Sequence, residues 1–279
     1  MERIKTIFKT IRPLRSIHFL LMTFLGAFIS YNFNLINLIL AMISIFFAWQ
    51  FNLIINDIFD VEIDKVANTD RIFTQRLVSR KKYLIVGISC ILISVLTGLF
   101  LNFLTLNFLS VIFICFFILM GYLYSGPPFR LRKYSFQTFF IGLGSFSAYM
   151  TGFFACSTYI LYREFIIGIL ILIALSLGTV VKDYKDIEGD KKDKVATIFT
   201  KFGLETGTKI CSIFLFLTFL IPLLLIYHLF DFIIIIPIAI TTVVMFNWKK
   251  NKKKVEVTFI FYFFEIAYIF LRYFSILIF

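Results

Sequence analysis

Residues 56–64 read NDIFDVEID and close a run of otherwise apolar residues that begins near Leu35. The stretch places four carboxylates and one asparagine at the end of a hydrophobic segment. An unpaired Asp at the centre of a membrane helix costs roughly 2.5 to 3.5 kcal/mol on insertion scales, which disfavours placing several of them there. We therefore expect this stretch to lie at a water interface or in a polar cavity.

The composition indicates a polytopic membrane protein. Of the 279 residues, 60% are hydrophobic and 16% are charged, and 39 are Phe. A soluble globule could not hydrate such a surface, whereas a chain that crosses a bilayer repeatedly requires it. A spanning helix needs about 20 mostly apolar residues, and the sequence predicts an all-α membrane protein with nine such helices in a single domain, residues 1–279. The nine stretches are 14–31, 34–56, 82–102, 104–124, 136–157, 162–182, 206–229, 231–247 and 257–278.

The basic residues predict the orientation of these spans. The net charge is +12, and 26 of the 28 Lys and Arg residues lie before the first stretch or around every second connection after it. With nine spans all of these regions lie on one side, which the positive-inside rule makes cytoplasmic. The run KKNKKK (249–254) is explained most simply as a topology anchor that touches anionic lipid. We therefore expect an integral protein of the cell membrane with a cytoplasmic N-terminus and no nucleic-acid partner.

The first acidic stretch has an echo later in the chain. DYKDIEGD (183–190) repeats its spacing, with one Asp, a second three residues later and a third four residues after that. On a helix each residue turns by about 100°, so both sets of three Asp residues are predicted to point one way from their helix. Asn56, Asp60 and Asp64 form an even straighter stripe.

Oxygen donors of this kind favour a hard divalent cation, above all Mg²⁺ shared between carboxylates and a substrate phosphate. The acids could instead be solvated loop charges paired with lysines, but mutual repulsion among three carboxylates opposes their ionisation, and the repeated spacing favours a metal. Two magnesium-loaded clusters facing each other would bind a diphosphate and make it a leaving group, and Phe-rich helices would hold a hydrocarbon tail. Among the neighbouring cations, Arg71 and Lys194 are predicted to bind the diphosphate.

Both motifs resemble the aspartate-rich motifs of the UbiA superfamily of intramembrane prenyltransferases. The resemblance covers essentially the whole chain, because IRPLRS (11–16), YLYSGPPFRLRK (122–133) and DKVAT (193–197) are also similar to family segments. It implies nine transmembrane helices around a central chamber, with a cytoplasmic cap formed by the two aspartate-motif loops. It also implies a Mg²⁺-dependent transfer from an isoprenyl diphosphate donor to a lipid acceptor.

The resemblance also implies roles for individual residues. Asp60, Asp64, Asp186 and Asp190 would be catalytic, and Tyr122 or Tyr124 would lie near the allylic carbon, with Tyr124 as the catalytic residue. The magnesium and diphosphate ligands would be Asn56, Asp57, Asp60, Asp64, Asp183, Asp186 and Asp190. Many relatives continue the first motif with Asp-Arg-Pro and a Pro-Ser-Gly turn, whereas this chain reads DRIFTQRLVSRKK, which keeps Arg71 but lacks the prolines and the glycine.

Within the superfamily, the compact length and basic mouth are most similar to the archaeal branch that makes digeranylgeranylglyceryl phosphate. This implies transfer of a geranylgeranyl group from geranylgeranyl diphosphate to the glycerol hydroxyl of geranylgeranylglyceryl phosphate, a step of ether-lipid biosynthesis. Arg12 or Arg15 and the segment RLRK (130–133) could hold the acceptor phosphate. The acceptor-binding set would be Arg12, Tyr122, Arg130 and Arg132.

Two alternatives remain open. An aromatic quinone precursor such as a hydroxybenzoate could replace the ether lipid as acceptor with the same metal chemistry. A cation transporter would also carry intramembrane acids, and Glu265 is one. However, transporter acids are expected near the bilayer midplane, and we interpret Glu265 as a structural partner for Tyr262 or Tyr268. His18 and His228 are isolated in the sequence and receive no ligand role.

Overall fold

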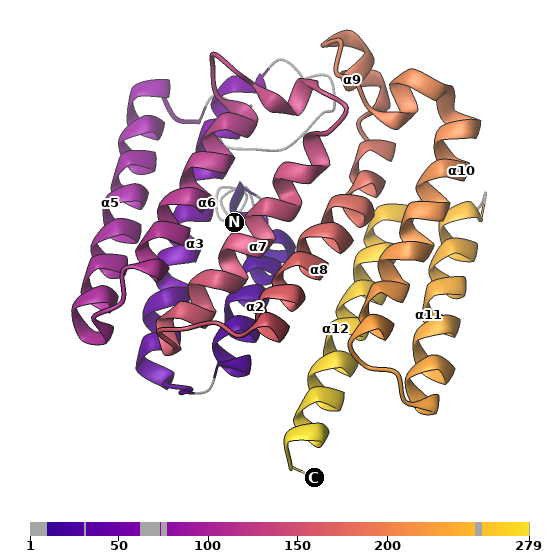
Figure 1. Cartoon of the computed structure of the whole chain (residues 1–279). Helices are drawn as coiled ribbons and strands as arrows, with labels where there is room; N and C mark the ends of the chain where they lie inside the picture. Colours follow the sequence, from indigo (N-terminus) through magenta and orange to yellow (C-terminus); the bar gives the residue numbers. More distant parts are fainter. Residues whose placement is uncertain (1–9, 31, 62–72, 74–76, 249–252, 279) are drawn as a thin grey trace.

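The computed structural model of the protein describes residues 10–30, 32–61, 73, 77–248 and 253–278. Within these ranges every regular element is a helix. Figure 1 shows a bundle of long helices, with the short helix α9 at one end and the C-terminus at the other. The long helices are α2 (Pro13–Ile29), α3 (Leu35–Phe59), α5 (Arg80–Thr105), α6 (Leu109–Ser125), α7 (Gln137–Cys156), α8 (Tyr162–Gly178), α10 (Ile198–Leu220), α11 (Leu229–Asn247) and α12 (Lys254–Ile278).

Short elements connect the long helices at the end where the motifs lie. The 3₁₀ helix η1 (Leu131–Lys133) follows α6, and the 3₁₀ helix η2 (Thr179–Tyr184) extends α8 before α9 (Ile187–Lys192). A third 3₁₀ helix, η3 (Ile221–Leu224), follows α10 and therefore lies at the other end of that helix. The connections around η1 and α9 meet, because the Ala196 amide donates to the Lys133 carbonyl at 2.9 Å.

Several helix starts carry side-chain caps that the sequence supplies. The Asn34 side chain accepts hydrogen bonds from the amides of Ile36 and Asn37 at the start of α3. Thr197 caps α10 in the same way by accepting from the Thr200 amide at 3.1 Å. Such caps satisfy amides that lack a partner within the helix.

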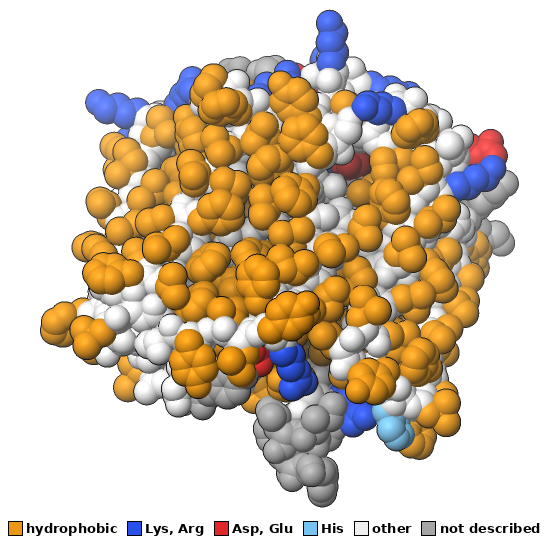
Figure 2. Space-filling model, in the orientation of Figure 1, with side chains coloured by type: hydrophobic (Ala, Val, Ile, Leu, Met, Phe, Trp, Pro, Cys, Tyr) orange, Lys and Arg blue, Asp and Glu red, His pale blue; other side chains and the backbone are white. Residues whose placement is uncertain are grey.

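Six helices in the described part of the chain are long and apolar enough to cross a membrane: Leu35–Phe59, Arg80–Thr105, Gln137–Cys156, Tyr162–Tyr184, Ile198–Leu224 and Leu229–Asn247. Two shorter apolar helices, Arg15–Ile29 and Leu109–Ser125, accompany them. Large apolar side chains on the outside of the bundle are compatible with contact to lipid. Examples are Leu96 and Phe103, which are 62% and 73% exposed. Figure 2 shows this apolar surface between basic side chains near the upper and lower edges. The number nine for the spans stays a prediction.

Helices α2 and α7 pack at very short range through two glycines. A Cβ atom on Gly26 would lie 1.9 Å from the Tyr149 carbonyl oxygen, and one on Gly152 would lie 1.8 Å from the Thr23 carbonyl oxygen. Only a residue without a side chain fits such backbone contacts, which is how small residues promote helix packing in membranes. The small-residue segment 142–152 therefore packs closely, as its sequence suggests.

Candidate active site

The first acidic motif lies at the end of α3. Asn56 and Asp57 are in its last turn, and Asp60 is the residue that directly follows the helix. Asp57 and Asp60 are almost fully buried, at 0% and 1% exposure. Asp64, the third member of this motif, and Arg71 lie outside the described residues.

Arginines from the loop around η1 bind Asp60. Arg130 donates to Asp60 Oδ1 at 3.1 Å and to the Phe59 carbonyl at 2.9 Å. Arg132 donates to the other carboxylate oxygen of Asp60, and the Asn56 amide donates to that same oxygen. Two guanidinium groups thus balance one buried carboxylate, as a buried charge requires.

Asp57 has a separate set of partners. Arg12, directly before α2, donates to Asp57 Oδ1 at 2.7 Å and to Asn56 Oδ1 at 2.9 Å. The Tyr83 hydroxyl, from α5, donates to Asp57 Oδ2 at 3.1 Å. Asp57 therefore ties α2 and α5 to the end of α3 and fixes the side chain of Arg12.

The second motif departs from the expected single helix. Asp183 lies in the 3₁₀ helix η2, Asp186 is the N-cap residue of α9, and Asp190 lies inside α9. A 3₁₀ helix has three residues per turn instead of 3.6, and the chain then starts a new helix. The prediction that these three Asp residues point one way from one α-helix is therefore wrong.

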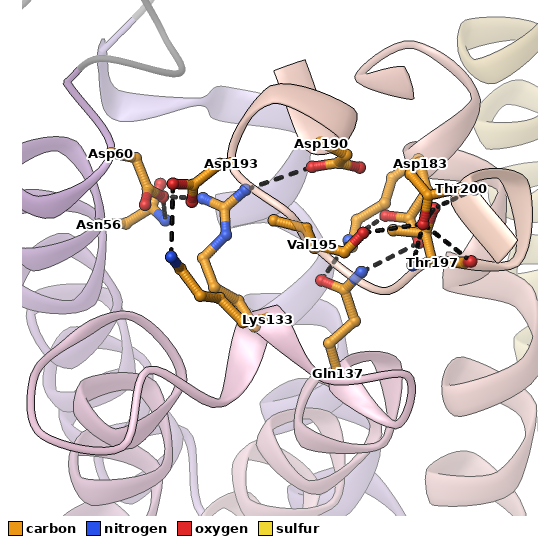
Figure 3. Close-up of polar contacts among 12 residues, drawn as sticks. Asn56, Asp60, Lys133, Gln137, Asp183, Asp190, Asp193, Val195, Thr197 and Thr200 are labelled. Atoms are coloured by element: carbon orange, nitrogen blue, oxygen red, sulfur yellow. Dashed lines mark hydrogen bonds and ion pairs between the residues drawn. The ribbon is translucent and has the colours of Figure 1, made fainter. Parts of the chain in front are cut away.

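Asp183 belongs to a buried polar network at the start of α7. Lys182 forms an ion pair with Asp183 Oδ1, and Gln137 donates to Asp183 Oδ2 at 3.2 Å. The Gln137 amide oxygen accepts from the Tyr124 hydroxyl at 3.1 Å and from Lys182 at 3.2 Å. Figure 3 shows Gln137 and Asp183 on one side of this region, and Asn56 and Asp60 on the other.

Asp190 and Asp193 lie between these two groups in Figure 3. Arg132 approaches Asp190 at 3.8 Å, and Asp193 pairs with Lys133 at 3.4 Å and with Arg130 at 3.5 Å. Burial, together with the nearby charge of Asp183, raises the pKa of Asp190 to about 7. A carboxyl of this kind binds and releases its proton near neutral pH.

A cavity opens beside these groups and continues between the helices. Its polar end is lined by Arg12, Asn56, Asp60, Tyr124, Arg132, Lys182 and Asp186. Its apolar part is lined by aromatic side chains of several helices, including Phe19, Trp49, Phe117 and Phe140. Such a space fits a ligand that has an anionic head and a hydrocarbon body.

Several predicted site residues lie outside this lining. Asp57, Asp183 and Asp190 are buried and do not line the cavity, and Arg130 contacts the lining residue Asp60. The Tyr122 hydroxyl donates to the Pro127 carbonyl at 3.0 Å, whereas Tyr124 lines the cavity. The Lys194 side chain is exposed.

Sequence reasoning missed three cavity or network residues. Gln137 and Lys182 connect Tyr124 to Asp183. Gln137 is an isolated polar residue at the start of an apolar stretch, and Lys182 directly precedes Asp183 in the second motif. His18 lines the cavity, with one ring nitrogen 2.6 Å from the Tyr262 hydroxyl and the other 2.9 Å from Ser145 Oγ. The available signal was the position of a single His inside an apolar stretch.

Glu265 does not have the partners that we expected. The Tyr262 hydroxyl is bonded to His18, and the Tyr268 hydroxyl donates to Asp231 at 2.6 Å. Glu265 is 4% exposed, and its Oε1 has no hydrogen-bond partner among the described residues. The interpretation of Glu265 as a partner of either tyrosine is therefore wrong.

The donor set at the polar end fits a hard divalent cation. Asn56, Asp60 and Asp186 offer oxygen atoms to the cavity, and oxygen is the ligand that Mg²⁺ prefers. Among the described residues Asp186 forms no ion pair, whereas Asp60 is occupied by arginines. Within the same part of the chain, no three His, Cys, Asp or Glu side chains converge as a metal cluster. A metal at Asp60 would therefore replace or displace guanidinium groups.

A helical membrane bundle with acids and arginines at the mouth of an apolar cavity defines a class: membrane enzymes that act on phosphorylated lipids. Residues 19–266 match the UbiA prenyltransferase family, and because this range covers most of the chain, the protein belongs to that family. It is therefore a prenyltransferase and an integral membrane protein, as the motifs predicted.

Curated relatives extend the comparison. The chain is 30% identical over 251 residues to digeranylgeranylglyceryl phosphate synthase of Methanocaldococcus jannaschii, covering 86% of this chain and 82% of that protein. It is 29% identical over 179 residues to 2-acylphloroglucinol 4-prenyltransferase of Humulus lupulus, covering 61% of this chain and 42% of that protein.

The fold is also similar to a solved structure of a UbiA homolog from Archaeoglobus fulgidus bound to DMAPP and Mg²⁺. The TM-score is 0.72 at 18% identity, with 95% of this chain and 98% of the other covered. At this identity the likeness establishes the fold.

Proposed function

We propose that the protein transfers a geranylgeranyl group from geranylgeranyl diphosphate to the glycerol hydroxyl of geranylgeranylglyceryl phosphate, in a Mg²⁺-dependent reaction. The observation that carries this proposal is the polar end of the cavity. There, acids that suit a metal–diphosphate complex lie beside arginines that suit a second phosphate, above one apolar space. Archaeal relatives named for this synthase activity support the choice of acceptor.

The donor diphosphate would lie between the two motifs. Asn56, Asp60 and Asp186 would hold Mg²⁺, which supplies charge neutralisation for the leaving diphosphate. The predicted ligands Asp64, Asp183 and Asp190, and the predicted diphosphate ligands Arg71 and Lys194, stay part of the proposal. Asp57 acts through Arg12, which it orients.

The reaction exchanges one carbon–oxygen bond for another. The bond between the allylic carbon and diphosphate would break, and diphosphate would leave with the electron pair. The glycerol oxygen would form the new ether bond and give up its proton to the departing diphosphate or to water. The ring of Tyr124 would stabilise the positive charge that develops on the allylic carbon. Gln137 fixes that ring by accepting from its hydroxyl, and Lys182 fixes Gln137 in turn.

The acceptor phosphate would bind to arginines at the mouth. Arg12 and Arg132 line the cavity, and Arg130 lies beside Arg132 through their shared partner Asp60. Tyr122, predicted as a further acceptor residue, bonds within its own loop. Both phosphate groups would then be held at one level, which brings the glycerol hydroxyl close to the allylic carbon.

We further propose that the chain forms one domain of nine spans in the cell membrane, with the two motif loops as a cytoplasmic cap. The apolar helices and the one-sided distribution of Lys and Arg support this orientation. Membership of a prenyltransferase family removes the transporter alternative.

An aromatic acceptor is the second candidate. The relative from Humulus lupulus is named for prenylation of an acylphloroglucinol, which is a ring acceptor. The arginines at the mouth favour an anionic acceptor over an uncharged ring such as an acylphloroglucinol. A hydroxybenzoate also carries an anion, so only the product assay separates it from the phosphorylated lipid.

A product assay separates the two candidates. Purified protein in nanodiscs would receive geranylgeranyl diphosphate with either geranylgeranylglyceryl phosphate or a hydroxybenzoate, in Mg²⁺ or in excess EDTA. We expect the ether-lipid product in Mg²⁺ and its loss in EDTA. Full turnover in EDTA would refute the role of the metal, and preference for the hydroxybenzoate would overturn the acceptor.

A further inference from the structure

A second cavity lies behind the first one, between α2, α8, η3 and α12. We call it the deep cavity; its lining includes Met22, Ile167, Pro222, Glu265 and Ile266. Leu175, Thr218 and Tyr262 line both the deep cavity and the cavity with the polar end. The two cavities therefore adjoin at these three residues, which we call the partition.

Tyr262 is the large member of this partition, and a hydrogen bond fixes its ring. One ring nitrogen of His18, Nε2, lies 2.9 Å from Ser145 Oγ, and Ser145 can donate its hydroxyl proton to the Ile141 carbonyl at 3.0 Å. The other nitrogen, Nδ1, forms a hydrogen bond with the Tyr262 hydroxyl at 2.6 Å. The neutral His18 ring thereby links Tyr262 on α12 to α2 and α7.

The deep cavity has a carboxyl side chain close to the partition, which disfavours entry of a hydrocarbon chain there. Glu265 lies three residues after Tyr262 on α12 and lines the deep cavity. Its Oε1 is buried without a hydrogen-bond partner in the described part of the chain. A tail that passed Tyr262 would meet a carboxyl side chain in place of an apolar one, which gives its carbon atoms a less favourable contact.

We propose that Tyr262 is a specificity-determining residue that sets the upper limit on prenyl tail length. The fixed ring closes the apolar part of the first cavity, and Glu265 behind it disfavours entry into the deep cavity. This inference rests on the proposed function, since it assumes that the first cavity holds the prenyl tail of the donor.

The test measures binding of non-hydrolysable prenyl thiolodiphosphates with a stepwise increasing number of isoprene units, by calorimetry with Mg²⁺ present. Wild-type affinity should drop at the first tail that is too long. In Tyr262→Ala the affinity for that tail, relative to the preceding one, should rise about tenfold or more, the scale of steric discrimination in apolar pockets.

Two further variants test the same partition. Leu175→Ala opens it from α8 without loss of a hydrogen bond and should shift the length limit in the same direction, so the test does not depend on folding of the tyrosine variant. The double variant Tyr262→Ala/Glu265→Leu should accept long tails better than Tyr262→Ala, because the carboxyl group nearest the partition is replaced by an apolar side chain.

Two controls accompany these variants. Glu265→Leu alone leaves the partition closed and should keep the wild-type length profile. Phe264→Ala removes an aromatic ring from the outer face of the same helix, where Phe264 is 64% exposed, and should also keep it.

The outcomes separate the inference from the proposed function. If the wild type binds no prenyl diphosphate analogue of any length, the proposed function fails. If it binds them but Tyr262→Ala and Leu175→Ala keep the wild-type length profile, the proposed function stands and the role of Tyr262 is refuted. A shift in the Phe264→Ala control would equally overturn it, because the effect would then not depend on the partition.

Discussion

Replacing Asp57 by Asn separates a structural acid from the acids that would bind metal. Asp57 is fully buried and accepts from Arg12 at 2.7 Å and from Tyr83 at 3.1 Å. Asn keeps the shape and one acceptor oxygen but removes the charge opposite Arg12, whose side chain is only 13% exposed. Breaking a buried ion pair outright costs about 3 to 5 kcal/mol, and the retained acceptor reduces this to about 1.5 to 3 kcal/mol, the range for hydrogen bonds to charged groups.

The corresponding fall in Tm is about 3 to 10 °C for a chain of this size. It can be measured in detergent by the amount of monodisperse protein that survives heating. Asp60→Asn is the contrast, because Asp60 lines the cavity and offers its oxygens to a metal. We expect Asp57→Asn to lower Tm with little change in Mg²⁺-dependent binding of a prenyl diphosphate analogue, and Asp60→Asn to abolish that binding.

The reasoning fails if Asp57→Asn keeps the wild-type Tm but loses metal-dependent binding as Asp60→Asn does. Asp57 would then be a direct ligand, as the motif alone suggested. A matched variant, Tyr83→Phe, removes the longer hydrogen bond of Asp57. It should lower the free energy of unfolding by about 1 kcal/mol, without an effect on metal-dependent binding.

Three further predictions follow from the same contacts. Asp186→Ala should abolish turnover in the product assay while the protein stays folded. Glu188→Ala changes an exposed acid two residues later and should leave the rate unchanged; equal losses of rate in both variants would refute the role of Asp186. Gly152→Ala should lower the free energy of unfolding by about 1 to 3 kcal/mol, measured as a lower Tm, or prevent folding, because its Cβ would overlap the Thr23 carbonyl. The pKa of Asp190 is raised in the folded protein, so the fold favours the protonated carboxyl. With metal removed by EDTA, the contribution of Asp190 to the free energy of unfolding is therefore full below the ordinary Asp pKa and is lost as pH rises through about 7. Metal binding needs the carboxylate, so Mg²⁺ affinity should rise over the same pH range; a flat thermal stability and a flat titration across it would contradict this.

The helices and the acidic motifs could be predicted because their signals are local. A helix occurs at each of the predicted apolar stretches in the described residues, since apolar length alone indicates such segments. The repeated Asp spacing led to the correct family because it is readable without knowledge of the fold.

The orientation of the individual acids could not be predicted in this way. Asp183 and Asp186 fall on either side of a helix break, and a periodic argument that assumes one continuous helix fails there. The partners of the acids were also hidden, because Arg12 reaches Asp57 and Arg132 reaches Asp60 across long sequence separations. Such contacts depend on tertiary packing and leave no local pattern.

The arginines at the mouth also change how a test of the acceptor site must be designed. From the sequence, Arg130 and Arg132 could be topology anchors or phosphate ligands, and a charge reversal at both would seem to report on the acceptor alone. In the structure both bind Asp60, so a reversal would place new carboxylates beside a proposed metal ligand and impair the donor site as well. Exposed lysines such as Lys191 and Lys192 lie away from the cavity lining and fit the topological role. We propose that the guanidinium groups bound to Asp60 would become available to a phosphate once a metal binds Asp60. This exchange would favour binding of the metal–diphosphate complex before the acceptor.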